Sequence, residues 1–363
     1  MIPFLDLKSA YLELKNEIDE AVSRVLESGW YILGDEVEAF EREWAAYCGA
    51  SFAVGVGSGL DALTLALRAL NVGPEDEVIV PSNTYIATWL AVTNLGAKIV
   101  PVEPDPSTYN LNPEEIEKVI TPRSKVILPV HLYGQPADLD QIVSIAKVYG
   151  IYVVEDAAQA HGAKYKGRNI GADGDIVCWS FYPGKNLGAF GDGGAITTNS
   201  KEISKRISLL RNYGSARKYF NEEHGVNSRL DPLQAAVLRV KLIYLDEWTQ
   251  RRRSIAKYYN ASFQDTSIIT PHVPDWAEPA WHLYCVQTDA RNELQKSLQK
   301  TNIQTMIHYP VPPHQQQAYQ DLGIDSSSLP IASRLAETML SLPIGPHLTF
   351  DNAADVVKHV LAN

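Results

Sequence analysis

The residue best suited to covalent chemistry lies in a glycine-rich segment, SFYPGKNLGAFGDGGAI, at residues 180–196. The segment follows the apolar run IVCW, which predicts a buried strand, and it contains one lysine, Lys185, with no acid before Asp192. Its glycines allow the backbone to bend tightly and to approach another group closely. A partly desolvated lysine loses pKa readily and can form a Schiff base with a carbonyl compound. The alternative is a solvated loop lysine, which is the usual environment of this residue type.

Two further motifs place polar or aromatic side chains where predicted strands end. In VVEDAAQAHG, Asp156 stands at the carboxyl end of a strand, where it either caps a helix or holds a positive charge on a heteroaromatic ring. Gln159 follows three residues later, and His161 is assigned to packing. In PSNTYIAT, the ring of Tyr85 either packs in the core or stacks on a planar cofactor. These positions favour a ligand site beyond the strand ends.

The segment GVGSG at residues 55–59 follows a predicted strand and opens a helix. Backbone N–H groups at such a helix start, together with the helix dipole, bind phosphate. A dinucleotide fingerprint needs a glycine where Leu60 stands, although Glu77 has the character of a ribose-binding acid. We therefore favour a single phosphate site over an NAD site, and a plain tight turn is the third interpretation.

A second candidate for anion binding is HGVNSRLDPLQAA, which precedes a long helical pattern. Asp231 and Pro232 are typical of a helix cap and first turn. Asn227 and Arg229 come just before them and are placed to reach an anion. A solvated arginine is the alternative.

Composition and charge narrow the functional class. The 363 residues are 45% hydrophobic and 21% charged, which is ordinary for a soluble globular protein, and a net charge of −11 favours neither nucleic acid nor an anionic membrane. Cys48, Cys178 and Cys285 form no CxxC pair, which fits a reducing cytosol and argues against the usual zinc spacing. The N-terminus does not resemble a signal peptide, and no apolar run predicts a membrane span. We therefore expect a cytoplasmic protein.

Alternating patterns predict an α/β fold with a mostly parallel sheet that helices cover on both faces. The predicted strands are 52–57, 77–82, 98–103, 125–131, 152–157, 176–181 and 195–199, with helices between the first five. A long helix is expected at 232–263, then a strand at 281–288 and helices near 290–300, 330–340 and 351–361. This change of pattern predicts a large domain at 1–247 and a small C-terminal domain at 248–363, and leaves the extreme N-terminus free to pack on the small domain.

Together these motifs resemble the DegT/DnrJ/EryC1/StrS family of nucleotide-sugar aminotransferases, which use pyridoxal phosphate (PLP) and belong to fold type I. The resemblance covers nearly the whole chain, and its motifs are SGWYILGDEVEAFE, VGVGSGLDAL, DAAQAHG, SFYPGKNLGAFGDGGA, HYPVPPH and SLPIGPHLT, in the family's order. It implies a large domain with a seven-stranded, mostly parallel sheet and a smaller C-terminal α/β domain.

The resemblance also implies a role for each site residue. Lys185 would carry PLP as a Schiff base and move protons, and Asp156 would keep the pyridine nitrogen protonated so that the ring withdraws electrons. Leu60 stands where the family often has threonine, so its contact is assigned to the backbone. The implied cofactor-binding residues are Ser58, Gly59, Leu60, Tyr85, Asp156, Gln159, Ser180, Lys185 and, from a neighbouring subunit, Asn227. The implied substrate-binding residues are Tyr31, Tyr182, Arg229, His308, Tyr309 and His314, and no metal is implied.

The implied reaction moves the amino group of L-glutamate to a nucleotide-linked keto-sugar. The most similar branch aminates C3 of a dTDP-3-keto-6-deoxyhexose, giving a dTDP-3-amino-3,6-dideoxyhexose and 2-oxoglutarate for deoxyamino-sugar biosynthesis, as in O-antigen or S-layer glycans. A homodimer with shared active sites is implied, with neither nucleic acid nor membrane as a partner.

Several alternatives stay open at this point. Within the aminotransferases, the substrate is alternatively a UDP-linked 3-keto sugar or a 4-keto sugar. A PLP-dependent sugar dehydrase would carry histidine in place of Lys185. An NAD-dependent oxidoreductase rests on GVGSG alone, and a non-enzymatic nucleotide-sugar binder would not need Lys185 and Asp156 together.

Overall fold

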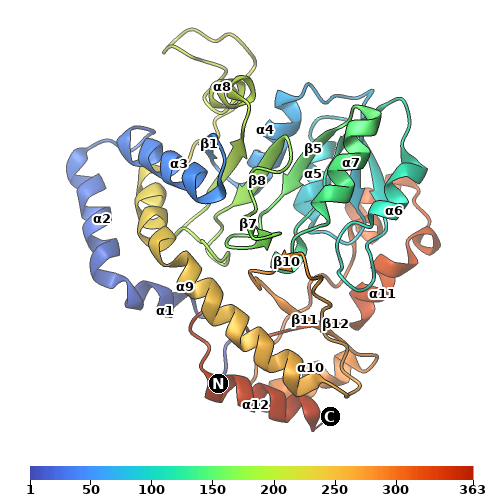
Figure 1. The fold of residues 1–363 in the computed structure, drawn as a ribbon. Coiled ribbons are helices and arrows are strands. Elements are labelled where there is room, and N and C mark those ends of the chain that lie inside the picture. The colour runs from blue at the N-terminus through green and yellow to red at the C-terminus, as the bar shows by residue number, and fades with distance from the viewer. Residues whose placement is uncertain (363) are drawn as a thin grey trace.

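A seven-stranded sheet forms the centre of the computed structural model, which describes residues 1–362 (Figure 1). Its strand order is β1-β9-β8-β5-β4-β2-β3. β9 is antiparallel to both of its neighbours, whereas the other pairs are parallel, so six strands run in one direction and their carboxyl ends meet at one edge. The strands are β1 (Phe52–Val56), β2 (Glu77–Pro81), β3 (Lys98–Val102), β4 (Ser124–Ile127), β5 (Tyr152–Asp156), β8 (Ile176–Ser180) and β9 (Gly194–Thr198).

Helices cover both faces of this sheet. α4, α5 and α8 pack on one face, and α3, α6, α7 and the first half of α9 pack on the other. The helices are α1 (Leu7–Glu13), α2 (Lys15–Ser28), α3 (Asp35–Cys48), α4 (Gly59–Ala69), α5 (Ile86–Thr93), α6 (Pro113–Ile116), α7 (Leu139–Tyr149), α8 (Lys201–Leu210), α9 (Pro232–Phe263), α10 (Arg291–Lys300), α11 (Pro330–Thr338) and α12 (Phe350–Leu361).

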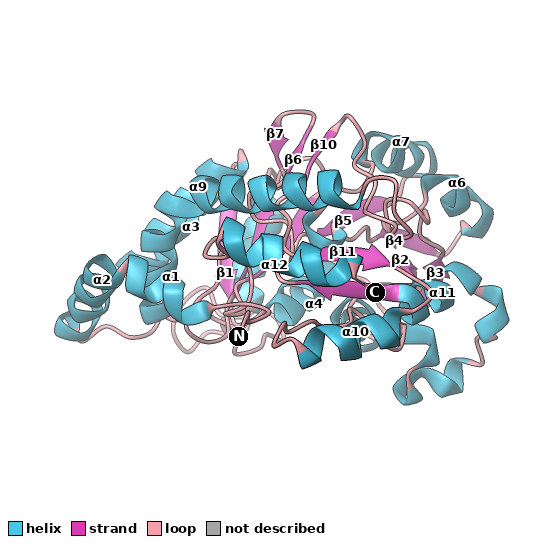
Figure 2. Cartoon of the chain, turned by 90° about the horizontal axis from the view of Figure 1, so that it is seen from below, coloured by secondary structure: helices cyan, strands magenta, loops and turns pink. Residues whose placement is uncertain are grey.

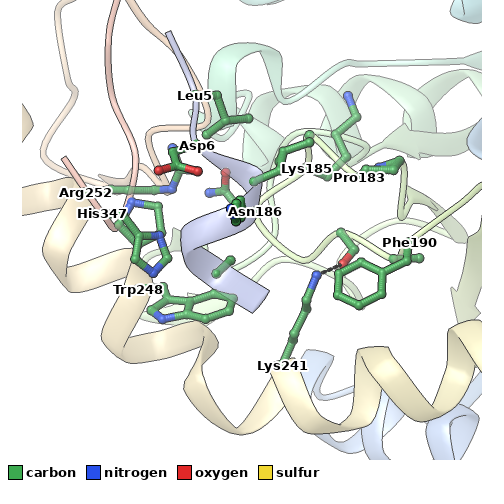
Figure 3. Close-up of a pocket in the computed structure, with 17 residues that line it drawn as sticks. Leu5, Asp6, Pro183, Lys185, Asn186, Phe190, Lys241, Trp248, Arg252 and His347 are labelled. Carbon is green, nitrogen blue, oxygen red and sulfur yellow. Dashed lines mark hydrogen bonds between the residues drawn. The ribbon is translucent and has the colours of Figure 1, made fainter. Parts of the chain in front are cut away.

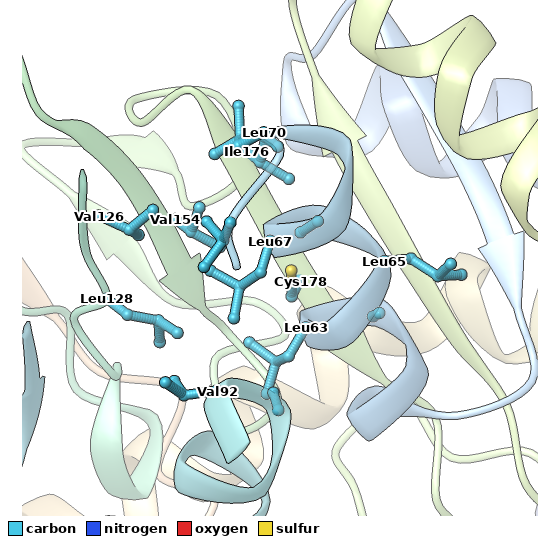
Figure 4. Close-up of a cluster of buried hydrophobic side chains, with 14 of the residues drawn as sticks. Leu63, Leu65, Leu67, Leu70, Val92, Val126, Leu128, Val154, Ile176 and Cys178 are labelled. Atoms are coloured by element: carbon cyan, nitrogen blue, oxygen red, sulfur yellow. The ribbon is translucent and has the colours of Figure 1, made fainter. Parts of the chain in front are cut away.

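Side chains of the central strands alternate between the two apolar faces. In β4, Val126 joins the core beneath α4 and α5, whereas Ile127 joins the core beneath α6 and α7. Figure 4 shows Leu67 of α4 pointing toward the strands that carry Val126 and Val154. Burial on both faces explains why the central strands are near-continuous apolar runs in the sequence.

The long helix α9 connects the sheet to the C-terminal part of the chain (Figures 1 and 2). Its second half packs with α10, α12 and the antiparallel strands β11 (Tyr284–Gln287) and β12 (Met339–Leu342) around a separate core. Ile2 belongs to that core and pairs with Ile303. Because α9 is one continuous helix, the division into domains at residues 247 and 248 stays a prediction.

The structure confirms the predicted sheet and corrects two details of the C-terminal half. Each of the seven predicted strands overlaps one strand of the sheet, and the predicted helix at 232–263 has those bounds. The helix expected near 330–340 ends at Thr338, because the next four residues pair with β11 as a strand. Asp231 occupies the N-cap of α9, but its side chain makes no capping hydrogen bond.

A small three-stranded sheet was not expected from the sequence. It consists of β6 (Lys164–Tyr165), β7 (Arg168–Asn169) and β10 (Ala277–Glu278), each two residues long. Strands this short leave no periodic pattern to detect. Within residues 1–362, no helix is long and apolar enough to cross a membrane.

Candidate active site

Polar side chains gather at the edge where the six parallel strands end. Ser58 begins α4 directly after β1, and Tyr85 begins α5 shortly after β2. Asp156 and Ser180 are the last residues of the adjacent strands β5 and β8. Ligands of open α/β sheets bind beyond this edge.

The start of α4 forms a cradle that only small residues permit. The Ser58 hydroxyl accepts a hydrogen bond from the Asp61 N–H at 3.1 Å, which orders the first turn. A Cβ at Gly59 would lie 2.6 Å from the Cβ of Ser180, and a Cβ at Gly194 would collide with the Ser58 carbonyl. The Leu60 side chain packs against the apolar core, so only its backbone faces the helix start. Free N–H groups and the helix dipole make this end of α4 suited to a phosphate.

Asp156 is a buried carboxyl at the same edge, only 6% exposed. Its Oδ2 accepts a hydrogen bond from the Thr88 hydroxyl at 2.8 Å, and its Oδ1 accepts one from the Ala158 N–H at 3.1 Å. Burial raises the pKa of this carboxyl, and these two hydrogen bonds and the positive charge of Lys185 oppose that rise. A carboxylate held out of water in this way favours a positively charged partner.

Lys185 lies in the loop after β8, where its N–H donates to the Tyr182 carbonyl at 2.8 Å. Burial lowers the pKa of its ammonium group to about 8, although the charge of Asp156 opposes this shift. Burial, and then the charge of Lys185, lower the pKa of His161 to about 3 and that of His308 to about 4. Neutral imidazoles therefore surround a lysine that loses its proton more easily than usual, which is the condition for a nucleophilic amine.

Aromatic and amide groups complete the wall of this edge. The Gln159 side chain accepts a hydrogen bond from the Tyr133 N–H at 2.6 Å and donates one to the Tyr309 hydroxyl at 3.0 Å. The ring of Tyr309 lies 5.3 Å from the ring of Tyr85, a residue that is 53% exposed. The His308 carbonyl accepts a hydrogen bond from the Tyr133 hydroxyl at 2.6 Å. This hydrogen bond connects the loop that carries His308 and Tyr309 to the turn at Tyr133, which follows β4.

Three of the expected substrate residues lie outside this group of contacts. Tyr31 lies between α2 and α3, and its hydroxyl donates to the Leu26 carbonyl in the last turns of α2. Tyr182 is exposed beside Lys185, and His314 is buried near Ser333, with 3.4 Å between its Nε2 and the serine hydroxyl. The structure therefore leaves the substrate roles of these three residues as predictions.

Asn227 and Arg229 are held within their own segment. Asn227 pairs with Asn212 across an isolated bridge, and the Arg229 guanidinium donates to the Asn212 side chain at 3.0 Å. The Arg229 guanidinium carbon also lies 5.5 Å from the centre of the Tyr213 ring, and its Nε is buried without a partner among the described residues. These contacts do not include Lys185 or Asp156, so the roles of the two residues in a neighbouring subunit stay a prediction.

Sequence reasoning missed Thr88, Tyr133 and His282. Thr84 and Thr88 are four residues apart with their hydroxyls 2.8 Å from each other, and this helical spacing after a strand was a detectable signal for Thr88. Tyr133 left no signal, because its role depends on a tight turn with a φ of 60°. His282 faces Asn186 at 3.3 Å, and burial, followed by the charge of Lys185, lowers its pKa well below the usual value.

The structure argues against the NAD interpretation. Glu77 stands at the amino end of β2, opposite the ligand edge. Its carboxylate is already paired with Lys98 at 3.0 Å and Arg123 at 2.9 Å and accepts a hydrogen bond from the Thr121 hydroxyl. It is therefore not free to bind a ribose. Within residues 1–362, no cluster of three or more histidine, cysteine or acidic side chains is arranged to hold a metal ion.

The residues at the strand edge fit a phosphorylated pyridine aldehyde. The Gly59 cradle matches a phosphate, the buried Asp156 carboxylate matches a protonated ring nitrogen, and Lys185 has the depressed pKa that a Schiff base needs. The half-exposed ring of Tyr85 offers a face for stacking. Each part of such a cofactor thus has a matching group.

Comparison with known proteins gives the same assignment. The DegT/DnrJ/EryC1/StrS aminotransferase family matches residues 12–361. The chain is 53% identical to the dTDP-3-amino-3,4,6-trideoxy-alpha-D-glucose transaminase of Streptomyces venezuelae, over 99% of this chain and 95% of that protein. It is also 53% identical to the dTDP-3-amino-3,6-dideoxy-alpha-D-galactopyranose transaminase of Aneurinibacillus thermoaerophilus, over 99% of both chains.

Solved structures agree with the fold. The crystal structure of S. venezuelae DesV in complex with a ketimine intermediate superposes with a TM-score of 0.98 at 53% identity, covering 99% of this chain and 97% of that one. A more distant structure from Bacillus subtilis, with its cofactor pyridoxamine phosphate bound, has a TM-score of 0.92 at 31% identity and covers 100% of this chain and 85% of that one. The fold is therefore the α/β fold type I, and the chain belongs to the DegT/DnrJ/EryC1/StrS aminotransferase family and is an aminotransferase that uses pyridoxal phosphate.

Proposed function

We propose that this aminotransferase moves the amino group of L-glutamate to C3 of a dTDP-3-keto-6-deoxyhexose. The observation that carries the chemistry is the half-buried Lys185, whose pKa is lowered, within reach of the charge of the buried Asp156. The choice of sugar is supported by the two relatives at 53% identity, whose names both give a dTDP-linked sugar with nitrogen at C3. Those relatives differ at C4, so the proposal specifies C3 and the nucleotide and leaves C4 unassigned.

The proposed cofactor site uses the strand-edge residues in fixed roles. The backbone at Ser58, Gly59 and Leu60 would hold the phosphate with the Ser180 hydroxyl, because a Cβ at Gly59 would come within 2.6 Å of Ser180. Tyr85 would stack on one face of the ring, and Gln159 would lie against the ring. When bound, pyridoxal phosphate supplies a carbonyl for the amino group and a ring that withdraws electrons from the reacting carbon.

Asp156 and Lys185 divide the proton chemistry between them. The Asp156 carboxylate, oriented by Thr88 and Ala158, would keep the ring nitrogen protonated through a charge-assisted hydrogen bond. The Lys185 amine would bind the cofactor, leave it when the amino donor arrives, and then take a proton from the donor's α-carbon. Its lowered pKa leaves a substantial unprotonated fraction near neutral pH, which this base needs.

We also propose a homodimer whose two active sites each use residues of both subunits. The half-buried Arg229 and the exposed Asn227 would reach the neighbouring site and contact its diphosphate and cofactor phosphate. Arginine suits the diphosphate because its planar fork donates to two oxygens at once. Support comes from apolar side chains left exposed, including Trp30 at 64%, Tyr31 at 50% and Tyr182 at 58%.

The proposed setting is the cytoplasm and a deoxyamino-sugar pathway, such as that of an O-antigen or S-layer glycan. Cys48, Cys178 and Cys285 are all free and buried thiols, which suits a reducing compartment.

The helix-start cradle predicts that Gly59→Ala weakens PLP binding at least about tenfold, since the new Cβ must displace Ser180 or the phosphate. Fluorescence titration of the apoenzyme with PLP measures the affinity. Gly73→Ala is the matched control, because a Cβ there meets nothing within 4 Å. Equal PLP affinity in the two variants would show that Gly59 does not shape a phosphate site.

The lowered pKa of Lys185 predicts how attachment of PLP depends on pH. The rate of attachment should rise with pH up to about 8 and then level off, because only the unprotonated amine reacts. Asp156→Asn should move this plateau to lower pH, since the charge of Asp156 favours the ammonium form. Borohydride fixation at timed intervals, followed by mass spectrometry of the Lys185 peptide, measures the rate. A rate that still rises steeply above pH 9 contradicts the assignment, as does PLP on another lysine.

The proposed substrate is tested with glutamate and a panel of dTDP-3-keto, UDP-3-keto and 4-keto sugars. The dTDP-3-keto-6-deoxyhexose should give the highest kcat/KM, and product NMR should place nitrogen on C3. Turnover of 4-keto sugars alone would overturn the choice of carbon, and a clear preference for UDP sugars would overturn the choice of nucleotide.

The shared-site model predicts complementation between two inactive variants, Lys185→Ala and Arg229→Ala. In a mixed dimer, one site receives both substitutions and the other receives neither, so random mixing restores about a quarter of the intact sites. Activity after subunit exchange measures this directly, and native mass spectrometry confirms that exchange occurred. Exchange without any recovered activity would mean that Arg229 serves the site of its own chain.

A further inference from the structure

A cavity of about 340 Å³ borders the loop that carries Lys185 (Figure 3). The loop from Pro183 to Phe190 forms one of its walls, and the N-terminal segment and helix α9 form others. Atoms that border a cavity have no packing contacts on that side. The position of this loop therefore depends on the contacts along its other sides.

The loop folds back on itself, so that its two ends move together. The N–H of Ala189 donates to the Phe181 carbonyl at 2.8 Å. Gly188 lies directly against Pro183, since a Cβ at Gly188 would come within 2.4 Å of the Pro183 carbonyl oxygen. A shift of residue 188 must therefore displace residue 183, which is two positions before Lys185.

Lys241 holds this loop from helix α9. It is 5% exposed, its Nζ donates to the Gly188 carbonyl at 2.6 Å, and the same Nζ lies 4.3 Å from the centre of the Phe190 ring (Figure 3). Gln234 is seven residues earlier on α9, and therefore on the same face of the helix, where its side chain accepts a hydrogen bond from the Phe190 N–H at 2.8 Å. One face of a continuous 32-residue helix thus contacts the C-terminal end of the loop twice.

An unpaired ammonium group is a costly way to make a structural contact. Lysines are almost never fully buried unless they are paired, and Lys241 has no carboxylate partner among the described residues. Burial lowers the pKa of its ammonium group to about 8. In return, a charged donor makes a shorter and stronger hydrogen bond to a carbonyl than a neutral donor does. The chain therefore gives up stability to hold one carbonyl of the Lys185 loop firmly.

We propose that Lys241 is a positioning residue that keeps the Lys185 amine in place for proton transfer by holding the Gly188 carbonyl. The inference rests on the proposed function, in which the Lys185 amine leaves the cofactor and then takes a proton from the amino donor. Once it has left, the amine is fixed only by its own side chain and loop. A displacement of about 1 Å from a reactive geometry costs about a hundredfold in rate, and Lys241 restricts such a displacement from outside the loop.

The first experiment examines the loop without cofactor or substrate. Hydrogen exchange of the apoenzyme, measured by mass spectrometry on peptides that span residues 181–190, reports on the amides of Lys185 and Ala189. In Lys241→Met these amides should exchange about tenfold faster, because the loop loses a charged hydrogen bond. Peptides from α4 and β5 should exchange as before, which separates a loosened loop from a general loss of stability. Lys257→Met, which changes an exposed lysine on the same helix, is the control and should exchange like the unaltered protein.

The second experiment determines whether the looser loop slows proton transfer. With glutamate and its α-deuterated form as donors, Lys241→Met should lower kcat about tenfold with KM nearly unchanged, and the deuterium isotope effect on kcat should increase. A preparation that merely contains less folded enzyme loses kcat without any change in the isotope effect. If Lys241→Met does not fold, Lys241→Gln serves in both experiments. Its neutral amide still donates to a carbonyl, so the same changes should appear at a smaller size.

The possible results contradict different statements. If the unaltered enzyme takes no amino group from glutamate, the proposed function fails, while the exchange experiment still decides whether Lys241 holds the loop. Equal exchange of the loop amides in Lys241→Met, Lys257→Met and the unaltered protein would overturn the holding contact. A loosened loop with an unchanged kcat and isotope effect would overturn the positioning role.

Discussion

The edge where the parallel strands end depends on a half-buried lysine and a buried aspartate that lie within reach of each other's charge. Transfer of an ion from water into a protein interior costs several kcal/mol even after relaxation, so both groups persist only because the surrounding fold is rigid. Six parallel strands end at this edge and place Asp156 on β5 and the Lys185 loop after the adjacent β8. The result is an amine whose pKa is lowered by burial and a carboxyl whose pKa is raised by it.

Much of this fold could be predicted because each central strand appears in the sequence as a run of apolar residues. Val126 and Ile127 face opposite cores, so every central strand must be apolar at consecutive positions, and such runs are visible in the sequence. Pro232 at the first turn of α9 fixed the start of that helix as well. In contrast, β12 is a four-residue strand that directly continues a helical pattern, and only its pairing with β11 defines it.

The central residues of the candidate site could be predicted from the sequence, but the residues that orient them could not. Lys185, Asp156 and the glycine cradle stand in dense local motifs, whereas the Thr88 hydroxyl reaches Asp156 across 68 positions of sequence. Lys241 is likewise buried, and its Nζ donates to the Gly188 carbonyl across 53 positions of sequence. Lysines on a long helix are normally solvated, so nothing local distinguishes Lys241 from the exposed Lys257. Long-range packing decides which cations are buried without a partner.

An acidic protein that binds anions needs local groups to hold them. With a net charge of −11, the chain offers little long-range attraction to a phosphate or a carboxylate. Its surface pairs arginines with acids, as Arg239 does with Glu36 and Glu43. Lys241 and Arg252 are instead buried and donate to backbone carbonyls, without a carboxylate partner among the described residues. The phosphate cradle uses a different device, because the start of α4 offers backbone N–H groups and the helix dipole without any cationic side chain.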